Sequence, residues 1–114
     1  MATVTPKSLA DGVLVGIADT TIYTAPASTT AVIRSITLCN VDSVTRTVDV
    51  HIVQSGGGVA AGKRIIDATS SGSLTAGQTL VLDNIYVLET GDIVSAIASA
   101  ASAISIRIDG SEVT

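Results

Sequence analysis

Residues 44–53 read Val-Thr-Arg-Thr-Val-Asp-Val-His-Ile-Val, with apolar side chains at most of the even-numbered positions. One face of an extended chain would carry the apolar members Val44, Val48, Val50 and Ile52. The opposite face would carry the polar members Thr45, Thr47, Asp49 and His51. Arg46 shares the apolar parity, and we expect its stem to be buried and its head to reach water. This period of two predicts a half-buried antiparallel strand.

The composition of the whole chain favours strands. Its 114 residues include 14 Val, 13 Ile and 15 Thr, whose branched side chains prefer a pleated strand to a helix. Alternation recurs where Ile104, Ile106 and Ile108 are separated by polar residues, and the pair Asp109-Gly110 that follows predicts a turn. Less regular strands are expected at residues 12–17, 20–24, 31–40, 63–68 and 79–89.

About eight strands separated by turn signals predict an all-β fold, an antiparallel β-sandwich of jelly-roll-like form. Within residues 79–89 the apolar phase shifts across Asp83-Asn84, which indicates a bulge or a strand that crosses between sheets. Residues 1–12 show no firm pattern and are interpreted as an N-terminal arm. Residues 13–114 are interpreted as a single sandwich domain.

Residues 92–103 leave an alternative open, because Ile93, Ile97 and Ala101 recur at near-helical spacing. We favour two strands, at residues 92–99 and 103–109, joined by a tight Ala/Ser connection. A helix continuing through this region would leave Ile106 on the polar side and would run through β-branched residues.

Composition and charge exclude several classes of function. Hydrophobic residues make up 46% and charged residues 14% of the chain, a balance opposite to that of a disordered protein. The net charge is −4 and the six Lys and Arg residues are scattered, so we expect no nucleic-acid partner. No apolar run approaches the length of a membrane span and no signal-like segment opens the chain, so we expect no membrane partner and synthesis in a cytoplasm.

A glycine-rich segment imitates a phosphate-binding loop. Gly57-x-x-x-x-Gly62-Lys63 matches the start of a P-loop, and residues 80–83 imitate the strand and aspartate that accompany one. The next position is Arg64, where a P-loop needs a hydroxyl to bind Mg²⁺, and β-branched residues stand where its helix should follow. We therefore interpret the segment as a hairpin loop and expect no cofactor.

His51 is the only histidine, and at a spacing of two it shares a strand face with Asp49. Such a pair could supply half of a metal site or a general acid–base pair, but no second histidine or G-x-S-x-G motif completes it. We interpret the two as an exposed polar pair, expect no enzyme, and assign no catalytic, cofactor-binding or metal-binding residue. The single cysteine, Cys39, allows no intrachain disulfide and is interpreted as a buried or half-buried filler.

Three aspartates, Asp11, Asp92 and Asp109, each adjoin a glycine. An Asp–Gly pair supplies the side-chain acceptor and the left-handed residue that a turn needs. Calcium binding needs several oxygens on one loop, and no DxDxDG-like cluster is present. We therefore interpret the three aspartates as turn residues.

The lack of large aromatic residues also bears on function. There is no Trp or Phe, so only Tyr23 and Tyr86 could stack on a sugar ring or a base. A core of Val, Ile, Leu and Ala is thin for a domain of this length, and burial against neighbouring subunits would remove further apolar surface from water. We therefore expect a homo-oligomer.

Three segments carry a resemblance to a known family. Residues 21–40 read Thr-Ile-Tyr-Thr-Ala-Pro-Ala-Ser-Thr-Thr-Ala-Val-Ile-Arg-Ser-Ile-Thr-Leu-Cys-Asn, residues 74–80 read Leu-Thr-Ala-Gly-Gln-Thr-Leu, and residues 88–94 read Leu-Glu-Thr-Gly-Asp-Ile-Val. With the closing strand at residues 104–113, they resemble a recurrent pattern in small β-sandwich virion proteins of tailed bacteriophages. The likeness covers residues 20–114.

The resemblance implies a structural virion protein, synthesised in the host cytoplasm and located on the capsid surface. The first expectation is a capsid decoration (cement) protein that binds the major capsid protein, stabilises the head and self-associates as a trimer or dimer. The alternative is a tail or fibre component that acts as a receptor- or glycan-binding module. A third, enzymatic hypothesis would centre on His51 and Asp49.

Overall fold

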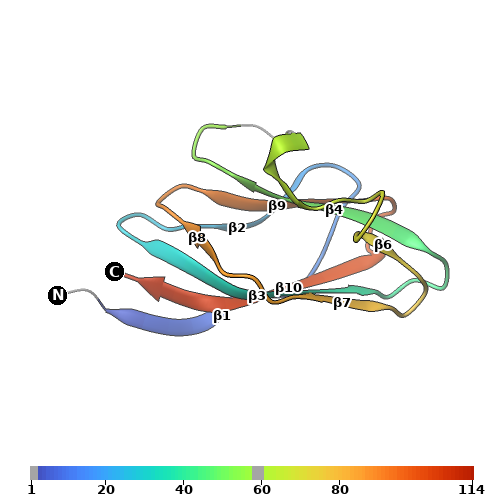
Figure 1. The fold of residues 1–114 in the computed structure, drawn as a ribbon, viewed down its shortest axis with the longest axis horizontal. Helices are drawn as coiled ribbons and strands as arrows, with labels where there is room; N and C mark the ends of the chain where they lie inside the picture. The colour runs from blue at the N-terminus through green and yellow to red at the C-terminus, as the bar shows by residue number, and fades with distance from the viewer. Residues whose placement is uncertain (1–2, 58–60) are drawn as a thin grey trace.

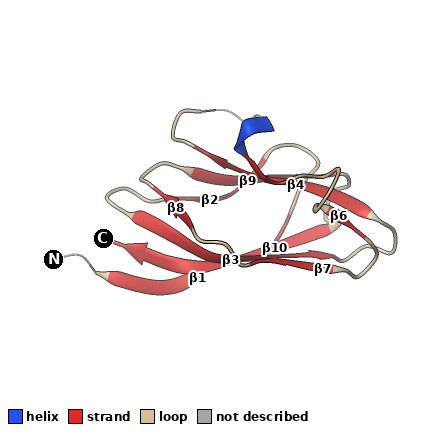
Figure 2. Cartoon of the chain, in the orientation of Figure 1, coloured by secondary structure: helices blue, strands red, loops and turns tan. Residues whose placement is uncertain are grey.

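The alternating residues lie in two antiparallel sheets that pack face to face (Figure 1). The computed structural model describes residues 3–57 and 61–114. The first sheet contains β1 (Val4–Leu14), β10 (Ile104–Val113), β3 (Thr30–Asn40), β7 (Thr79–Leu82) and β8 (Tyr86–Leu88). The second contains β2 (Thr20–Thr24), β9 (Ile93–Ala98), β4 (Arg46–Val53), β5 (Arg64–Ile66) and β6 (Ser73–Leu74). Figure 2 shows one short helical turn beside these strands, the 3-10 turn η1 (Ala61–Lys63).

The strand order is that of a jelly roll. The first sheet has the order β1-β10-β3-β7, with β8 also paired to β3, and the second has the order β2-β9-β4-β5, with β6 also paired to β4. The first strand therefore pairs with the last and the second with the last but one, as β1 with β10 and β2 with β9. Successive strands lie in alternate sheets, except that β5 and β6 stay in the sheet of β4 and β8 stays in the sheet of β7. The ten strands reduce to eight when β7 with β8 and β5 with β6 are each counted as one interrupted strand. The predicted antiparallel, jelly-roll-like sandwich is confirmed.

The phase shift within residues 79–89 is an interruption of one strand position. Both β7 and β8 pair with β3, so the chain does not cross to the other sheet. Residues 83–85 separate them, and Ile85 projects into solvent. The shift is therefore a bulge-like irregularity within one strand position, and the alternative of a strand that crosses between the sheets is wrong.

Residues 92–109 form strands, as we predicted, and not a helix. β9 belongs to the second sheet and β10 to the first, so residues 99–103 carry the chain from one layer to the other. Ser102 takes a left-handed conformation in this connection, with φ of 58°. Ile106 points into the core, fully buried.

The N-terminal segment differs from the expected arm. Residues 4–14 form β1, an edge strand that pairs with β10 from Val4 opposite Val113 to Leu14 opposite Ser105. Two register shifts interrupt the pairing, and only Leu9 and Ala10 are buried. Backbone hydrogen bonds hold most of this strand, so it shows little of the apolar alternation that predicts strands from sequence.

The turn expected at Asp109-Gly110 is absent, and β10 continues to Val113. The pair instead sits at a register shift, where Asp109 pairs with Ser35 and Gly110 pairs with Ile33. A methyl group at position 110 would overlap the carbonyl oxygen of Val32. Glycine is therefore needed because the backbone of β3 approaches closely, as is common at β-bulges.

Branched aliphatic side chains fill the space between the sheets. The central strands contribute residues with no exposed surface: Ile33, Ile36 and Leu38 from β3, Ile104, Ile106 and Ile108 from β10, and Val48 and Val50 from β4. Complete burial of one such side chain stabilises the fold by about 1.5–3 kcal/mol. The members from β4 and β10 belong to the alternating patterns of the sequence, which therefore identified that part of the core. Val44, expected on the same face, is 49% exposed and lies before β4 begins.

We predict that Gly110→Ala lowers the free energy of unfolding by about 2–3 kcal/mol, because the new methyl group collides with the backbone of β3. Gly62→Ala is the matched control, since no heavy atom of the described residues lies within 4 Å of the added carbon. Urea unfolding of the three proteins measures the difference. Equal stability of the two variants would contradict the close approach at Gly110.

Candidate interaction surface

His51 is buried, so the exposed polar pair expected with Asp49 is wrong. His51 is 1% exposed and lies opposite Ser95 of β9, which is fully buried. Both side chains have the outward parity of the second sheet, and η1 lies on this outer side of the sheet, beside β4 (Figure 1). His51 Nδ1 and Ser95 Oγ have no hydrogen-bond partner among the described residues. The alternation of residues 44–53 indicates which side of the strand faces outward, but it does not show that this outer side is covered.

Asp49 has a structural use of its own. Its Oδ1 accepts a hydrogen bond from the backbone N–H of Ala68 at 2.7 Å and lies 3.6 Å from Nε of Arg64. It therefore anchors the segment that follows β5. The described structure gives no hydrogen bond between Asp49 and His51, so the two side chains do not form an acid–base pair.

The segment that imitates a P-loop has a different geometry. Lys63 ends η1, and Arg64 begins strand β5 in place of a helix. Residues 80–82 belong to β7 in the other sheet, so the accompanying strand is not adjacent. Residues 58–60 of the loop lie outside the described residues. The helical turn described here, η1, is only three residues long and leads into a strand, so it does not correspond to the phosphate-binding helix of a P-loop.

Of the three aspartates expected in turns, Asp92 confirms the prediction. Its carboxylate accepts hydrogen bonds from the backbone N–H groups of Glu89 and Ser55, beside Gly91 with φ of 86°. Asp11 lies at a bulge of β1, next to a left-handed Gly12, and Asp109 lies within β10. Residues 3–57 and 61–114 contain no group of three or more acidic, His or Cys side chains placed to hold a metal ion.

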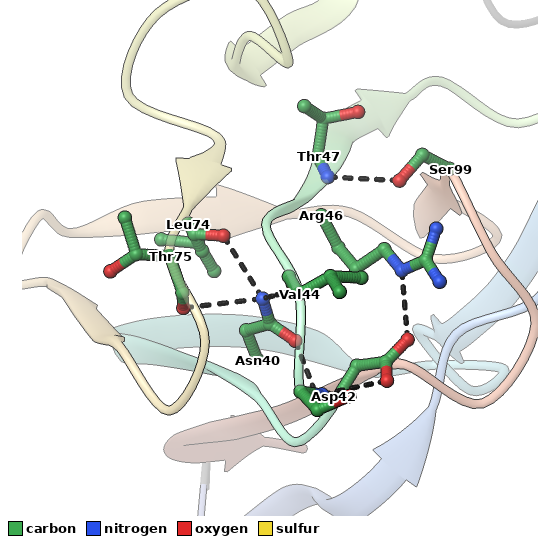
Figure 3. A network of polar contacts seen from close by, with 9 residues as sticks. Asn40, Asp42, Val44, Arg46, Thr47, Leu74, Thr75 and Ser99 are labelled. Carbon is green, nitrogen blue, oxygen red and sulfur yellow. Dashed lines mark hydrogen bonds and ion pairs between the residues drawn. The ribbon is translucent and has the colours of Figure 1, made fainter.

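Asn40 is the central buried polar residue, and the sequence reasoning missed its role (Figure 3). Its Nδ2 donates to the carbonyl oxygens of Val44 at 2.8 Å, Leu74 at 2.9 Å and Thr75 at 3.2 Å. Its Oδ1 accepts from the backbone N–H of Asp42 at 2.9 Å. One side chain therefore joins the end of β3 to the connection into β4 and to β6. In the sequence, the only signal of this role is an amide residue at the end of an apolar strand.

An ion pair extends this network to the surface. Nε of Arg46 lies 2.8 Å from Oδ2 of Asp42, and the hydrogen bond from Arg46 lowers the pKa of the Asp42 carboxyl. The backbone N–H of Ser43 lowers that pKa further. Arg46 is half-buried at the margin of β4, as predicted. The turn between the two sheets is thus held at its start and at its end.

A second polar contact joins the sheets through Glu112 of β10. The Tyr23 hydroxyl of β2 donates to Oε2 at 2.6 Å, and Nζ of Lys7 in β1 lies 3.2 Å from Oε1. Burial raises the pKa of Tyr23, and the hydrogen bond to Glu112 raises it further. The same hydrogen bond lowers the pKa of Glu112, with Lys7 adding to the effect. This cluster closes the sandwich near the chain ends.

The outward side of the first sheet is uncovered, and we call it the open face. It consists of the outward side chains of β1, β10, β3, β7 and β8. Four of its large apolar side chains are at least half exposed: Val4 at 62%, Leu14 at 50%, Val81 at 53% and Val87 at 60%. Half-buried Cys39 also lies on this side, between the inward residues Leu38 and Asn40. These four apolar side chains lie on β1, β7 and β8, so the open face offers exposed apolar surface along both of its margins.

The middle of the open face carries four charged residues, which we call the central charge cluster: Arg34, Arg107, Asp11 and Asp109. Arg107 lies 2.9 Å from Asp11 and 3.3 Å from Asp109. Arg34 is exposed at the bulge of β3 and has no pairing partner on β10. Among the described residues, no carboxylate lies within ion-pair distance of Arg34. The cluster contains two positive and two negative side chains and is therefore neutral overall.

Comparisons with known proteins give a structural likeness only. No family model and no curated protein matches the sequence. A chain of the T13 IBDV viral particle matches with a TM-score of 0.52 and 14% identity, over 98% of this chain and 30% of that one. A chain of the infectious bursal disease virus Gx strain gives a TM-score of 0.47 at 17% identity, and a chain of an infectious bursal disease virus VP2 subviral particle gives 0.45 at 16% identity. These cover 99% and 98% of this chain and 32% of theirs.

The first of these matches shows a shared fold. The chain spans about a third of the length of the solved chains that it matches. At 14% identity the likeness establishes a β-sandwich of the kind found in a viral particle, and the assignment to tailed bacteriophages stays a prediction. Within the described ranges, no apolar helix reaches the length needed to cross a bilayer.

We predict that Asn40→Ala lowers the free energy of unfolding by about 3 kcal/mol, because three carbonyl groups and one N–H lose their buried partner. Asn84→Ala is the control, since Asn84 is exposed and its amide lies 3.4 Å from the Tyr86 hydroxyl. Chemical denaturation measures both. A loss for Asn40→Ala no larger than that of the control would refute the central role of the amide.

We predict that Tyr23→Phe lowers the free energy of unfolding by about 1 kcal/mol at neutral pH, a hydrogen bond to a charged group discounted for partial exposure. The folded state lowers the pKa of Glu112, so this stabilisation is present above the ordinary value of 4.5 and is lost as the pH falls through the folded value. The deficit of Tyr23→Phe should therefore shrink as the pH falls below 4.5 and through the lowered pKa of Glu112.

Tyr86→Phe serves as the control for this measurement, because the Tyr86 hydroxyl has only the long contact to exposed Asn84. Stability curves of the wild type and both variants between pH 2 and pH 7 provide the comparison. A deficit for Tyr23→Phe that stays constant over this range would show that Glu112 does not contribute through its charge.

Proposed function

We propose that this chain is a structural protein of a virus particle, and within that class a capsid decoration protein bound to the outside of the major capsid protein shell. The observation that carries the proposal is the jelly-roll sandwich. Over 98% of this chain, the sandwich matches 30% of a chain of the T13 IBDV viral particle. Fold alone does not define function. The surface supports the same proposal, because the open face presents exposed valine and leucine side chains.

The positions behind the resemblance to tailed-phage proteins are framework positions. Asn40 organises the crossover between the sheets, Tyr23 joins them through Glu112, and Asp92 closes a turn. These residues therefore build the sandwich and leave its surface free to vary. We extend the proposal to a tailed phage on this resemblance, with location on the capsid surface and synthesis in the host cytoplasm. No catalytic residue enters the proposal.

The alternative, a glycan-binding module of a tail or fibre, has less support from the aromatic residues. Stacking on a sugar needs a free ring face, and glycan sites add convergent polar groups. The Tyr23 hydroxyl is held by Glu112, and both Tyr23 and Tyr86 pack partly against the core. Exposed Asn84 lies beside the Tyr86 hydroxyl, but the ring of Tyr86 packs partly against the core, so it offers less free surface for stacking.

Copy number in purified particles tests the proposal. A decoration protein covers a symmetric shell, so we expect several hundred copies per particle, whereas a tail or fibre protein would give about a dozen. Quantitative mass spectrometry against the major capsid protein measures this ratio in particles from cells that carry the gene. A ratio of about a dozen copies would support the alternative, and absence from particles would refute both.

Loss of the gene gives a second measurement. Particles assembled without the protein should release their genome at a lower temperature, because the shell loses the contacts that the decoration protein supplies. Adding the purified chain to these particles should restore the release temperature of the wild type. Unchanged release temperatures with and without the protein would contradict a stabilising role.

A further inference from the structure

The two outer faces of the sandwich differ in how they are covered. On the second sheet, the outward residues His51, Val53 and Ser95 are exposed by 1% or less, and η1 lies on this side of the sheet (Figure 1). On the open face of the first sheet, Val81 and Val87 remain more than half exposed. The chain thus covers one face with its own residues and leaves the other bare. We propose that a second copy of this chain covers the open face.

The size of the open face suits a stable dimer. Four strand positions about 4.8 Å apart and strands of 10–11 residues rising about 3.3 Å per residue give a footprint of roughly 650 Å². The accessible area of a pleated surface exceeds its footprint. The open face therefore approaches the roughly 800 Å² per partner of a standard interface.

The central charge cluster makes the open face complementary to itself. A patch with charges of one sign would repel its own copy, whereas this cluster contains two cations and two anions. Arg34 lacks an ionic partner among the described residues of its own chain. Asp109 lies next to it across the sheet, because it pairs with Ser35. Asp109 contacts Arg107 in its own chain, so in a facing copy its carboxylate would be shared between Arg107 and the incoming Arg34.

One symmetric arrangement uses these features together. The inner strands of the first sheet are β10 and β3, and a twofold axis running along the strands between them exchanges the two. It places Arg34 of each copy opposite Asp109 of the other. The same axis places Val87 of β8 over Pro6 of the other copy, because Val87, Val32, Ser111 and Pro6 form one row across the sheet. The two open faces then overlap over their full width.

This inference concerns the self-association that accompanies the proposed function, and it is tested on the purified full-length chain without any virus particle. A chain that stays monomeric yet coats particles in hundreds of copies would overturn the dimer and leave the proposed function standing. A chain that dimerises but is absent from particles would do the reverse. The two proposals therefore fail separately.

Sedimentation velocity over about 1 µM to 1 mM chain tests the surface. We expect a dimer in the wild type, and we expect Val81→Glu and Val87→Glu each to weaken it about tenfold or more. Val44→Glu is the matched control, because Val44 is 49% exposed and lies outside the open face. Circular dichroism verifies that the variants retain the fold. A monomer throughout, a trimer, or equal weakening by Val44→Glu would overturn the proposal.

A charge exchange identifies the pairing itself. Arg34→Glu and Asp109→Arg should each weaken self-association, since each places like charges opposite one another at both symmetric contacts. An equimolar mixture of the two variants should dimerise again, because every contact then joins opposite charges. In parallel, alkylation of the free Cys39 thiol should slow as the wild-type concentration rises. Failure of the mixture to associate would exclude the Arg34–Asp109 contact and with it the proposed axis.

Discussion

The buried amide of Asn40 is the constraint on which the rest of the fold depends. A jelly roll requires the chain to pass repeatedly between layers, and each passage leaves backbone groups without a strand partner. At the passage from β3 to β4, Asn40 supplies donors for three carbonyl oxygens and an acceptor for one N–H. It also holds β6 near β4, because Leu74 is one of its acceptors and pairs with Arg46. A single polar residue thus sets the relation between the sheets at this end.

The opposite end of the sandwich is closed by chemistry of another kind. Tyr23, Glu112 and Lys7 join strands of both sheets through one carboxylate. This contact lies near the surface, so water screens it and its contribution is smaller than that of the buried amide. Aliphatic packing lies between the two polar contacts and provides most of the stabilisation. The polar residues select the arrangement that this packing stabilises.

Several errors of the sequence interpretation share one origin. The expected turn at Asp109-Gly110 is a bulge inside β10, because the glycine admits the β3 backbone and does not end the strand. His51 is buried although its parity is outward, because the chain covers this side of the second sheet. β1 was missed because backbone pairing with β10, and not side-chain burial, holds it. In each case the deciding contact comes from outside the strand itself.

The sequence by itself determined that the chain forms strands and which side of β4 and β10 faces the core. Those properties depend on local periodicity and on branched side chains, and both can be counted in the sequence. Only the tertiary structure decided which outer face is covered, which charges meet and where Asn40 finds its partners. These contacts join residues far apart in the chain, and their energies depend on distance and exclusion of water, which no periodicity records.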